Sequence, residues 1–216
     1  MSKTYGKTRW KRFALVMVPS IAATAGIGVS IAQSALAASF SVSGQSFKVT
    51  TDQLHGTNFA QFGGVDLETN GTPHVIAVSA FDHATIKNLC QSVVTDLGPL
   101  GKWTLVLNAG QSDDPAKQVQ ASNLLIDLNQ LNADATFNNI AIGQDASTLK
   151  GTATQGWKDH MGHGLPSGAT GFAQAADSAD LSNVQQTAYA TSAGTFSLNG
   201  LKLNIHQGSG AGVECY

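Results

Sequence analysis

Three residues with metal-binding side chains lie within five positions of one another: Asp159, His160 and His163. A neutral imidazole nitrogen binds zinc or copper near pH 7, so this cluster has suitable chemistry. A structural zinc site, however, has four protein ligands, and no cysteine or carboxylate follows at a second fixed spacing. We therefore expect a solvated loop here rather than a metal site, and we expect no cofactor.

Two serine patterns bear on nucleophilic catalysis. Ser147 and Lys150 match the Ser-x-x-Lys spacing, but the Ser-Asp-Asn and Lys-Thr-Gly segments that accompany it in hydrolases are absent. The Gly-x-Ser-x-Gly turn of α/β-hydrolases is also absent, and its nearest match, residues 208–212, lacks the glycine two positions before its serine. Because a triad is recognised by geometry, catalytic residues stay unknown at this point and hydrolysis stays open.

The remaining histidines and glycines carry no further motif. Gly162, Gly164 and Gly171 do not join a buried strand to a helix, so they do not form a nucleotide-binding loop. Four other histidines are isolated, and each is predicted to be a surface or satisfied core residue: His55, His74, His83 and His206.

The elements that must position these residues are mostly strands. Apolar and short polar residues alternate over residues 103–108 and 124–142, and residues 75–78 are apolar throughout. Such alternation puts the apolar side chains on one face of a strand. Over residues 84–94 a short helix competes with a strand. We predict a mainly β fold, an antiparallel sandwich or a curved sheet, with one or two short helices.

Two hairpins of similar design are predicted, at residues 40–49 and 194–206. In the second, Asn199-Gly200 fits a two-residue type I′ turn, which needs positive φ at both central positions. That turn would pair Phe196 with Leu203 and place the apolar side chains on one face. Whether this face is core or groove stays open.

The first 37 residues are typical of an export signal. A basic start is followed by a charge-free stretch from Phe13 to Ala37 that ends in Ala-Leu-Ala. The stretch is also long enough to span a membrane, so cleavage after Ala37 and retention as an anchor both stay open. Residues 38–216 are predicted to form a single extracytoplasmic β-rich domain with a Gly-rich loop at about 143–171.

Removal of the signal changes the charge. The whole chain has a formal charge of −2, but after residue 37 seven lysines face fourteen carboxylates and no arginine remains. Binding of nucleic acid depends on cationic side chains that neutralise phosphate, so we exclude this class of partner.

Two cysteines, Cys90 and Cys215, remain in the mature chain. In an oxidising compartment a single pair predicts a disulfide, although two buried thiols stay an alternative. The bridge would close a loop of about 126 residues, and chain entropy assigns such a loop on the order of 4 to 5 kcal/mol.

Several blocks of the sequence resemble one family: "TRWKRFALVMVPS", "NLCQSVV", "ASNLLIDLNQLNADATFNNIAIG" and the terminal "ECY". It is an uncharacterised actinobacterial family of exported proteins with a domain of unknown function, whose members are sometimes labelled cholesterol esterase. The resemblance implies export and proximity to a small membrane protein, and it supplies no catalytic residue.

Two functions from different classes follow. The first is a non-enzymatic, exported protein of the cell envelope or extracellular space that binds a lipid, another apolar ligand or a membrane partner. Long amphipathic strands with one apolar face support it, although the same face could be core. The alternative is a hydrolase of lipid esters, which has no recognisable nucleophile motif.

Overall fold

The computed structural model describes residues 42–159 and 162–216 of the 216-residue chain. The predicted export signal over residues 1–37 and the metal-ligand candidate His160 lie outside the described residues. All the described residues belong to one structural unit, Leu36–Tyr216.

This unit is mainly β and antiparallel, which confirms the predicted fold class. Its described residues contain one short helix, α2 (Thr152–Gly156), and four turns of 3₁₀ helix. Within residues 42–159 and 162–216, no helix has the length and apolar character needed to cross a membrane. The strands are β1 (Phe47–Leu67), β2 (Pro73–Lys87), β3 (Leu89–Asp96), β4 (Lys102–Ala109), β5 (Val119–Asn138), β6 (Ala141–Asp145), β7 (Phe172–Ser192), β8 (Thr195–Ser197) and β9 (Lys202–Gln207).

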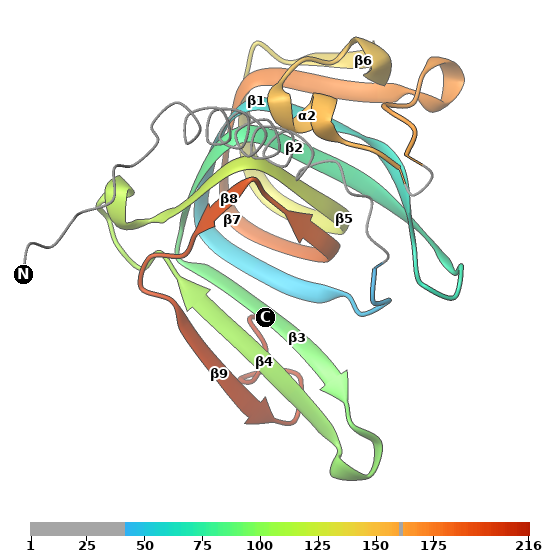
Figure 1. Ribbon diagram of the computed structural model, residues 1–216. Coiled ribbons are helices and arrows are strands. Elements are labelled where there is room, and N and C mark those ends of the chain that lie inside the picture. Colours follow the sequence, from blue (N-terminus) through green and yellow to red (C-terminus); the bar gives the residue numbers. More distant parts are fainter. Residues whose placement is uncertain (1–41, 160–161) are drawn as a thin grey trace, which may run out of the picture. The chain divides into compact units, whose positions relative to one another are not determined.

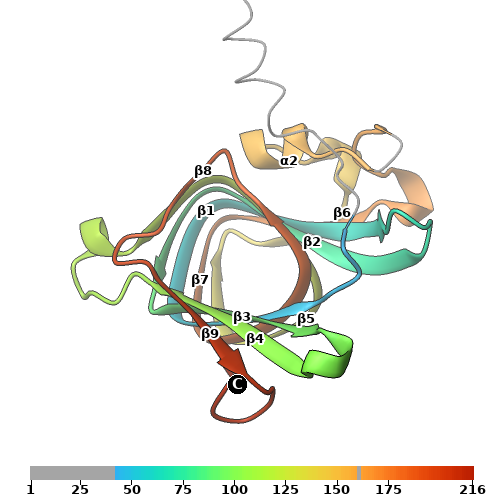
Figure 2. The same ribbon diagram turned by 60° about the horizontal axis from the view of Figure 1, so that its bottom comes forward.

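Four long strands form a closed cycle, which we call the ring (Figures 1 and 2). β1 pairs with β2, β2 pairs with β5, β5 pairs with β7, and β7 pairs again with β1, always in antiparallel fashion. The view in Figure 2 shows these strands around a common interior. A sheet that closes in this way hides one complete face from solvent.

Asparagines with positive φ lie within the ring strands, at Asn58, Asn123 and Asn183, or directly after one, at Asn88 and Asn139. Few residues other than glycine adopt this left-handed conformation, and asparagine tolerates it best because its short side chain bonds locally. Four of these asparagines donate a side-chain hydrogen bond to an aspartate on a neighbouring strand. The pairs are Asn58–Asp82, Asn88–Asp52, Asn139–Asp177 and Asn183–Asp134.

The strand registers arrange these pairs in two lines across the sheet. Because a left-handed residue turns the chain away from its extended path, we infer that the sheet bends along both lines and so closes. The first line contains Asn123, Asp82, Asn58, Asp177 and Asn139, and the second contains Asn88, Asp52, Asn183 and Asp134.

The inside of the ring is the larger apolar core. Leu124 on β5, Phe81 on β2 and Val184 on β7 are among its buried side chains, each 2% exposed or less. The outside of the ring carries a second apolar cluster, in which Phe62 and Val78 are covered by the Gly-rich segment 143–171. This predicted loop therefore contains α2 and buried residues, and it packs on the sheet through contacts such as the edge-on Phe62–Trp157 pair.

The remaining long strands, β3, β4 and β9, form a three-stranded extension that we call the wing (Figure 1). β3 joins the wing to the ring through a short pairing with β1. The C-terminal tail, residues 208–216, is tied to β3 by the Cys90–Cys215 disulfide, which confirms the predicted bridge. The tail is also tied to β1, because Lys48 Nζ lies 2.9 Å from Glu214 Oε2, and this hydrogen bond lowers the pKa of Glu214.

The predicted hairpin over residues 194–206 is wrong. β8 pairs with β5, whereas β9 pairs with β4. Asn199-Gly200 does form a turn, but of the two residues Gly200 alone has positive φ, as in a type II turn. Such a turn splays the flanking strands instead of pairing them. The Asn199 side chain is held by the carbonyl oxygen of Gln118 at 2.9 Å.

One further local prediction differs from the structure, and one open alternative is decided by it. In the region of the predicted hairpin at 40–49, Val42 forms an isolated bridge with Glu68 instead of pairing with the start of β1. Of the two alternatives for residues 84–94, the strand is correct: the segment forms the end of β2 and most of β3, which pair within the sheet.

Candidate functional site

One face of the wing is apolar and open. Side chains of directly paired residues lie on the same face of a sheet. Leu105 pairs with Ile205, and Leu107 pairs with Leu203. Leu203 is 57% exposed and Ile205 is 65% exposed. We call this face the apolar wing face, and it comprises Val93, Trp103, Leu105, Leu107, Leu203 and Ile205.

The opposite, more polar face of the wing is covered by the C-terminal tail. Thr104 Oγ1 donates to the carbonyl oxygen of Gly208 at 2.7 Å, and the backbone N–H of Cys215 donates to Ser92 Oγ at 3.1 Å. Both hydroxyl-bearing residues are almost completely buried. The tail therefore covers the polar face over β3 and β4, whereas β9 is exposed on both faces. The apolar face stays open, which is unusual for a surface sheet.

The apolar wing face continues into the inside of the ring. Leu89, Gln91 and Val93 alternate on one face of β3, and Leu89 belongs to the ring core. At this junction a small cavity of about 30 Å³ is lined by Leu89, Gln91 and Phe196 among others. A second cavity, of about 60 Å³, lies deeper in the ring and shares Leu54, Ile126 and Gln186 with the first.

Charge is divided unevenly between the two regions. The wing and tail, residues 89–109 and 201–216, carry two lysines and two carboxylates. The rest of the described chain carries five lysines and twelve carboxylates. The wing is thus electrically neutral overall, while the remaining part is strongly acidic.

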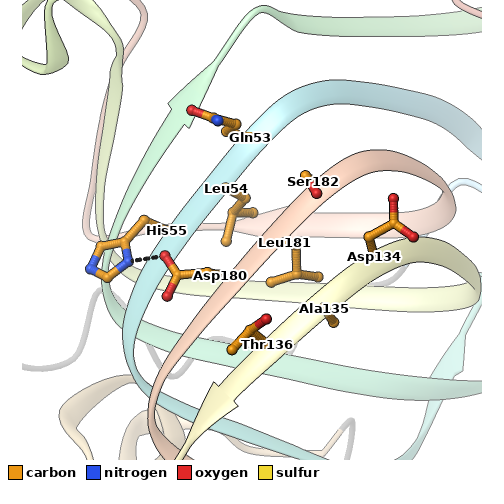
Figure 3. A pocket seen from close by; sticks show the side chains of 9 residues that line it. All are labelled: Gln53, Leu54, His55, Asp134, Ala135, Thr136, Asp180, Leu181 and Ser182. Atoms are coloured by element: carbon orange, nitrogen blue, oxygen red, sulfur yellow. Dashed lines mark hydrogen bonds and ion pairs between the residues drawn. The ribbon is translucent and has the colours of Figure 1, made fainter.

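The outer surface of the ring has a polar depression of about 400 Å³ (Figure 3). His55 Nδ1 lies 2.6 Å from Asp180 Oδ1 there, and both side chains are about half exposed. Ser182 lines the same depression, two residues beyond Asp180 on β7 and opposite Gln53. In the described part of the chain no hydrogen bond joins Ser182 to His55, so the geometry provides a His–Asp pair without a nucleophile in contact.

The Ser147–Lys150 pattern does not form a catalytic pair in the structure. Ser147 Oγ donates to Asp145 Oδ1 at 2.6 Å. This bond, with backbone donors from Gly168 and Ser147, lowers the pKa of Asp145. The Ser147 hydroxyl therefore bonds to the N-cap residue of the 3₁₀ helix Ala146–Thr148, which is Asp145.

The metal-ligand candidates are partly described. His163 Nδ1 lies 3.0 Å from Asp159 Oδ2, and the His163 backbone N–H donates to Asp159 Oδ1 at 2.7 Å. Among the described residues, no three His, Cys, Asp or Glu side chains come together in a way that could hold a metal ion.

Asp127 is the ionisable group most affected by its surroundings. It lies on β5 opposite Val78 and Ala190, and its Oδ1 is buried with no hydrogen-bond partner in the described residues. Burial, with a smaller effect from the nearby Asp66 carboxylate, raises the pKa of Asp127 to about 7.

Sequence reasoning found the apolar alternation but missed which of its faces stays open. Phe196 and Leu203, which it paired, lie instead on different strands. A detectable signal was the pair Leu203 and Ile205 on a short strand at the end of the chain, where few residues remain to cover it.

The comparisons with known proteins identify a family and give no function. The family described as "Family of unknown function (DUF6230)" matches residues 43–216. No curated protein and no solved structure matches the chain.

Proposed function

Because the chain belongs to a family of unknown function, DUF6230, we propose from its geometry that it is an exported, non-enzymatic cell-envelope protein that binds the acyl chain of a lipid. In this proposal the acyl chain lies along the apolar wing face, and the end of the acyl chain enters the junction between the wing and the ring. One observation carries the proposal: the tail covers the polar face of β3 and β4, while the apolar face of the wing stays open.

The cavities favour a flexible chain over a bulky ring system. Pockets that enclose drug-sized ligands measure roughly 300–1,000 Å³. The two cavities inside the ring measure about 60 and 30 Å³, so they have room for a chain end and not for a sterol nucleus. An acyl chain is long and narrow, and most of its length is accommodated by the open strand face.

The distribution of charge also favours an apolar ligand on the wing. The neutral wing brings no carboxylate excess to an apolar ligand, whereas the acidic remainder of the protein keeps its surface hydrated. Burial of apolar surface contributes roughly 25 cal/mol per Å², so the exposed Leu203 and Ile205 side chains supply much of the expected affinity.

The test uses the chain from Ala38, which includes all the described strands, and parinaric acid as a fluorescent fatty-acid probe. Leu203→Asp puts a charge on the apolar wing face and should weaken binding roughly tenfold or more. Asn204→Asp adds the same charge to the same strand on the opposite face, so its affinity should stay close to that of the wild type. Equal loss in both variants contradicts the assigned face.

A second assay separates binding from catalysis. Nitrophenyl esters are offered to the wild-type chain and to Ser182→Ala, because Ser182 is the serine that shares a depression with the His55–Asp180 pair. The proposal expects no turnover that depends on this serine. Turnover abolished by one serine substitution would support the hydrolase alternative instead.

A further inference from the structure

The turn between β3 and β4, residues 97–101, exposes two leucines at the end of the wing that lies away from the ring (Figure 1). Leu97 is 46% exposed and Leu100 is 68% exposed. We call residues 97–101 the wing tip. Its sequence, Leu-Gly-Pro-Leu-Gly, contains no charged side chain.

The backbone of the wing tip satisfies its own hydrogen-bond donors. Leu97 N–H donates to Gly101 O, Leu100 N–H to Leu97 O, and Gly101 N–H to Gly98 O. Gly98 N–H donates to Asp96 Oδ1 at 2.9 Å, and Pro99 has no N–H. An apolar medium penalises every unpaired backbone donor, and this turn presents none to it.

The base of the wing tip has the chemistry of a membrane interface. The indole N–H of Trp103 donates to the carbonyl oxygen of Leu100 at 3.0 Å, so the aromatic ring is fixed beside the tip. Asp96 and Lys102 are paired across the two strands directly behind the tip, and their charges cancel. Tryptophan and lysine are the side chains that commonly anchor a protein at headgroup depth.

We propose that the wing tip inserts into the interfacial region of a lipid bilayer, with Leu97 and Leu100 among the acyl chains and Trp103 at the headgroups. The wing tip shares Trp103 with the apolar wing face, but Leu97 and Leu100 lie outside that face. Insertion of the tip holds whether or not a fatty acid binds to the apolar wing face. A protein with both features would meet its acyl chain at the membrane surface.

Charge indicates which bilayer the tip prefers. The tip region is neutral, and the acidic remainder is repelled by anionic lipid. Binding should therefore be stronger to phosphatidylcholine vesicles than to phosphatidylglycerol vesicles at low salt. Salt should reduce that difference, because it screens the repulsion.

The experiment measures co-sedimentation of the chain from Ala38 with phosphatidylcholine vesicles. Leu100→Asp should lower the bound-to-free ratio roughly tenfold, because a carboxylate opposes insertion. The matched control is Ile142→Asp on β6, since Ile142 is 66% exposed and lies outside the wing. The control should bind vesicles as the wild type does.

A second readout covers the case in which Leu100→Asp fails to fold. In Trp157→Phe, Trp103 is the remaining tryptophan of the chain from Ala38, so its quenching by brominated lipid reports the depth of the wing tip. Strong quenching that persists when Leu203→Asp is added supports insertion, because Trp103 also borders the apolar wing face. Absence of quenching, no sedimentation of the wild type, or equal loss in the Ile142→Asp control each overturns the proposal.

The two proposals fail in different ways. Leu203→Asp should lose parinaric acid and keep phosphatidylcholine vesicles, whereas Leu100→Asp should lose vesicles and keep parinaric acid. Stronger binding to phosphatidylglycerol that weakens with salt indicates capture by lysines and contradicts insertion of the tip.

Discussion

The ring and the wing are made of the same kind of strand, but they treat their apolar faces in opposite ways. Leu124 in the ring is 1% exposed, whereas Ile205 in the wing is 65% exposed. The ring strands contain left-handed asparagines that bend the sheet until it closes. In the described residues of β3, β4 and β9 no residue other than glycine has positive φ, so the wing stays open. Alternation of apolar and polar residues thus makes one face of a strand apolar. Bends in the sheet then decide whether that face is hidden from solvent.

The largest expected effect concerns the tail, which makes the wing unlike an ordinary sheet. Reduction of Cys90–Cys215, or the double Cys→Ser variant, should lower the free energy of unfolding by about 4 kcal/mol, because the bridge closes a loop across 125 positions. Hydrogen exchange should show faster exchange in β3, β4 and β9 than in the wild type. Faster exchange confined to the ring would contradict the role of the disulfide in stabilising the wing.

The next effect tests the bends that close the ring. Asp82 accepts hydrogen bonds from Asn58 Nδ2 at 2.7 Å and from the backbone N–H of Ala153 at 2.9 Å, and it is buried. Asp82→Ala leaves both donors unpaired and should cost about 3 kcal/mol in urea unfolding.

Asp134 provides the matched control for Asp82. It accepts the same kind of bond from Asn183 but is exposed, so water replaces the lost partner. Asp134→Ala should cost less than about 1 kcal/mol. Similar losses in the two variants would mean that burial of the bend has no special weight.

These bends also mark the limit of what the sequence could predict. Strand alternation indicated the mainly β fold and most of the strands, because period-two patterns depend on the chain locally. Strand alternation did not show which strands pair with one another to close the ring. Asparagine inside a strand is unfavourable, and Asn58, Asn123 and Asn183 within otherwise strand-like segments were the available signal.

The candidate site was less predictable than the fold. The single cysteine pair predicted the disulfide correctly, but no local pattern shows which face the tail covers. The turn at Asn199-Gly200 was correctly located and its type was wrong, because Asn199 bonds to Gln118, a residue far away in sequence. Tertiary contacts of this kind decide strand partners, and they are absent from a local pattern.

Asp127 allows a smaller effect to be tested on the outer face of the ring. Its folded-state pKa, about 7, lies above the ordinary value of 3.8, so folding favours the protonated form. Its contribution to stability is complete below pH 4 and is lost as the pH rises through 7. Asp127→Asn should therefore raise the free energy of unfolding by about 2 kcal/mol at pH 8 and change it little at pH 4.

The control for Asp127 is Asp96→Asn, an exposed carboxylate of the wing. Urea unfolding of both variants at pH 4, 6 and 8 gives the comparison. A gain that is equal at all three pH values would show that the effect of Asp127→Asn is packing rather than ionisation.

The smallest expected effect separates the two apolar faces most directly. Leu203→Ala removes a side chain that is 57% exposed and should change the free energy of unfolding by no more than about 0.5 kcal/mol. Leu124→Ala removes the same atoms from the closed ring and should cost about 3 kcal/mol, because it leaves a cavity. Both are measured by urea unfolding without lipid. A loss at Leu203 close to that at Leu124 would show that the apolar wing face is already packed against protein, and an acyl chain would then have no surface on which to lie.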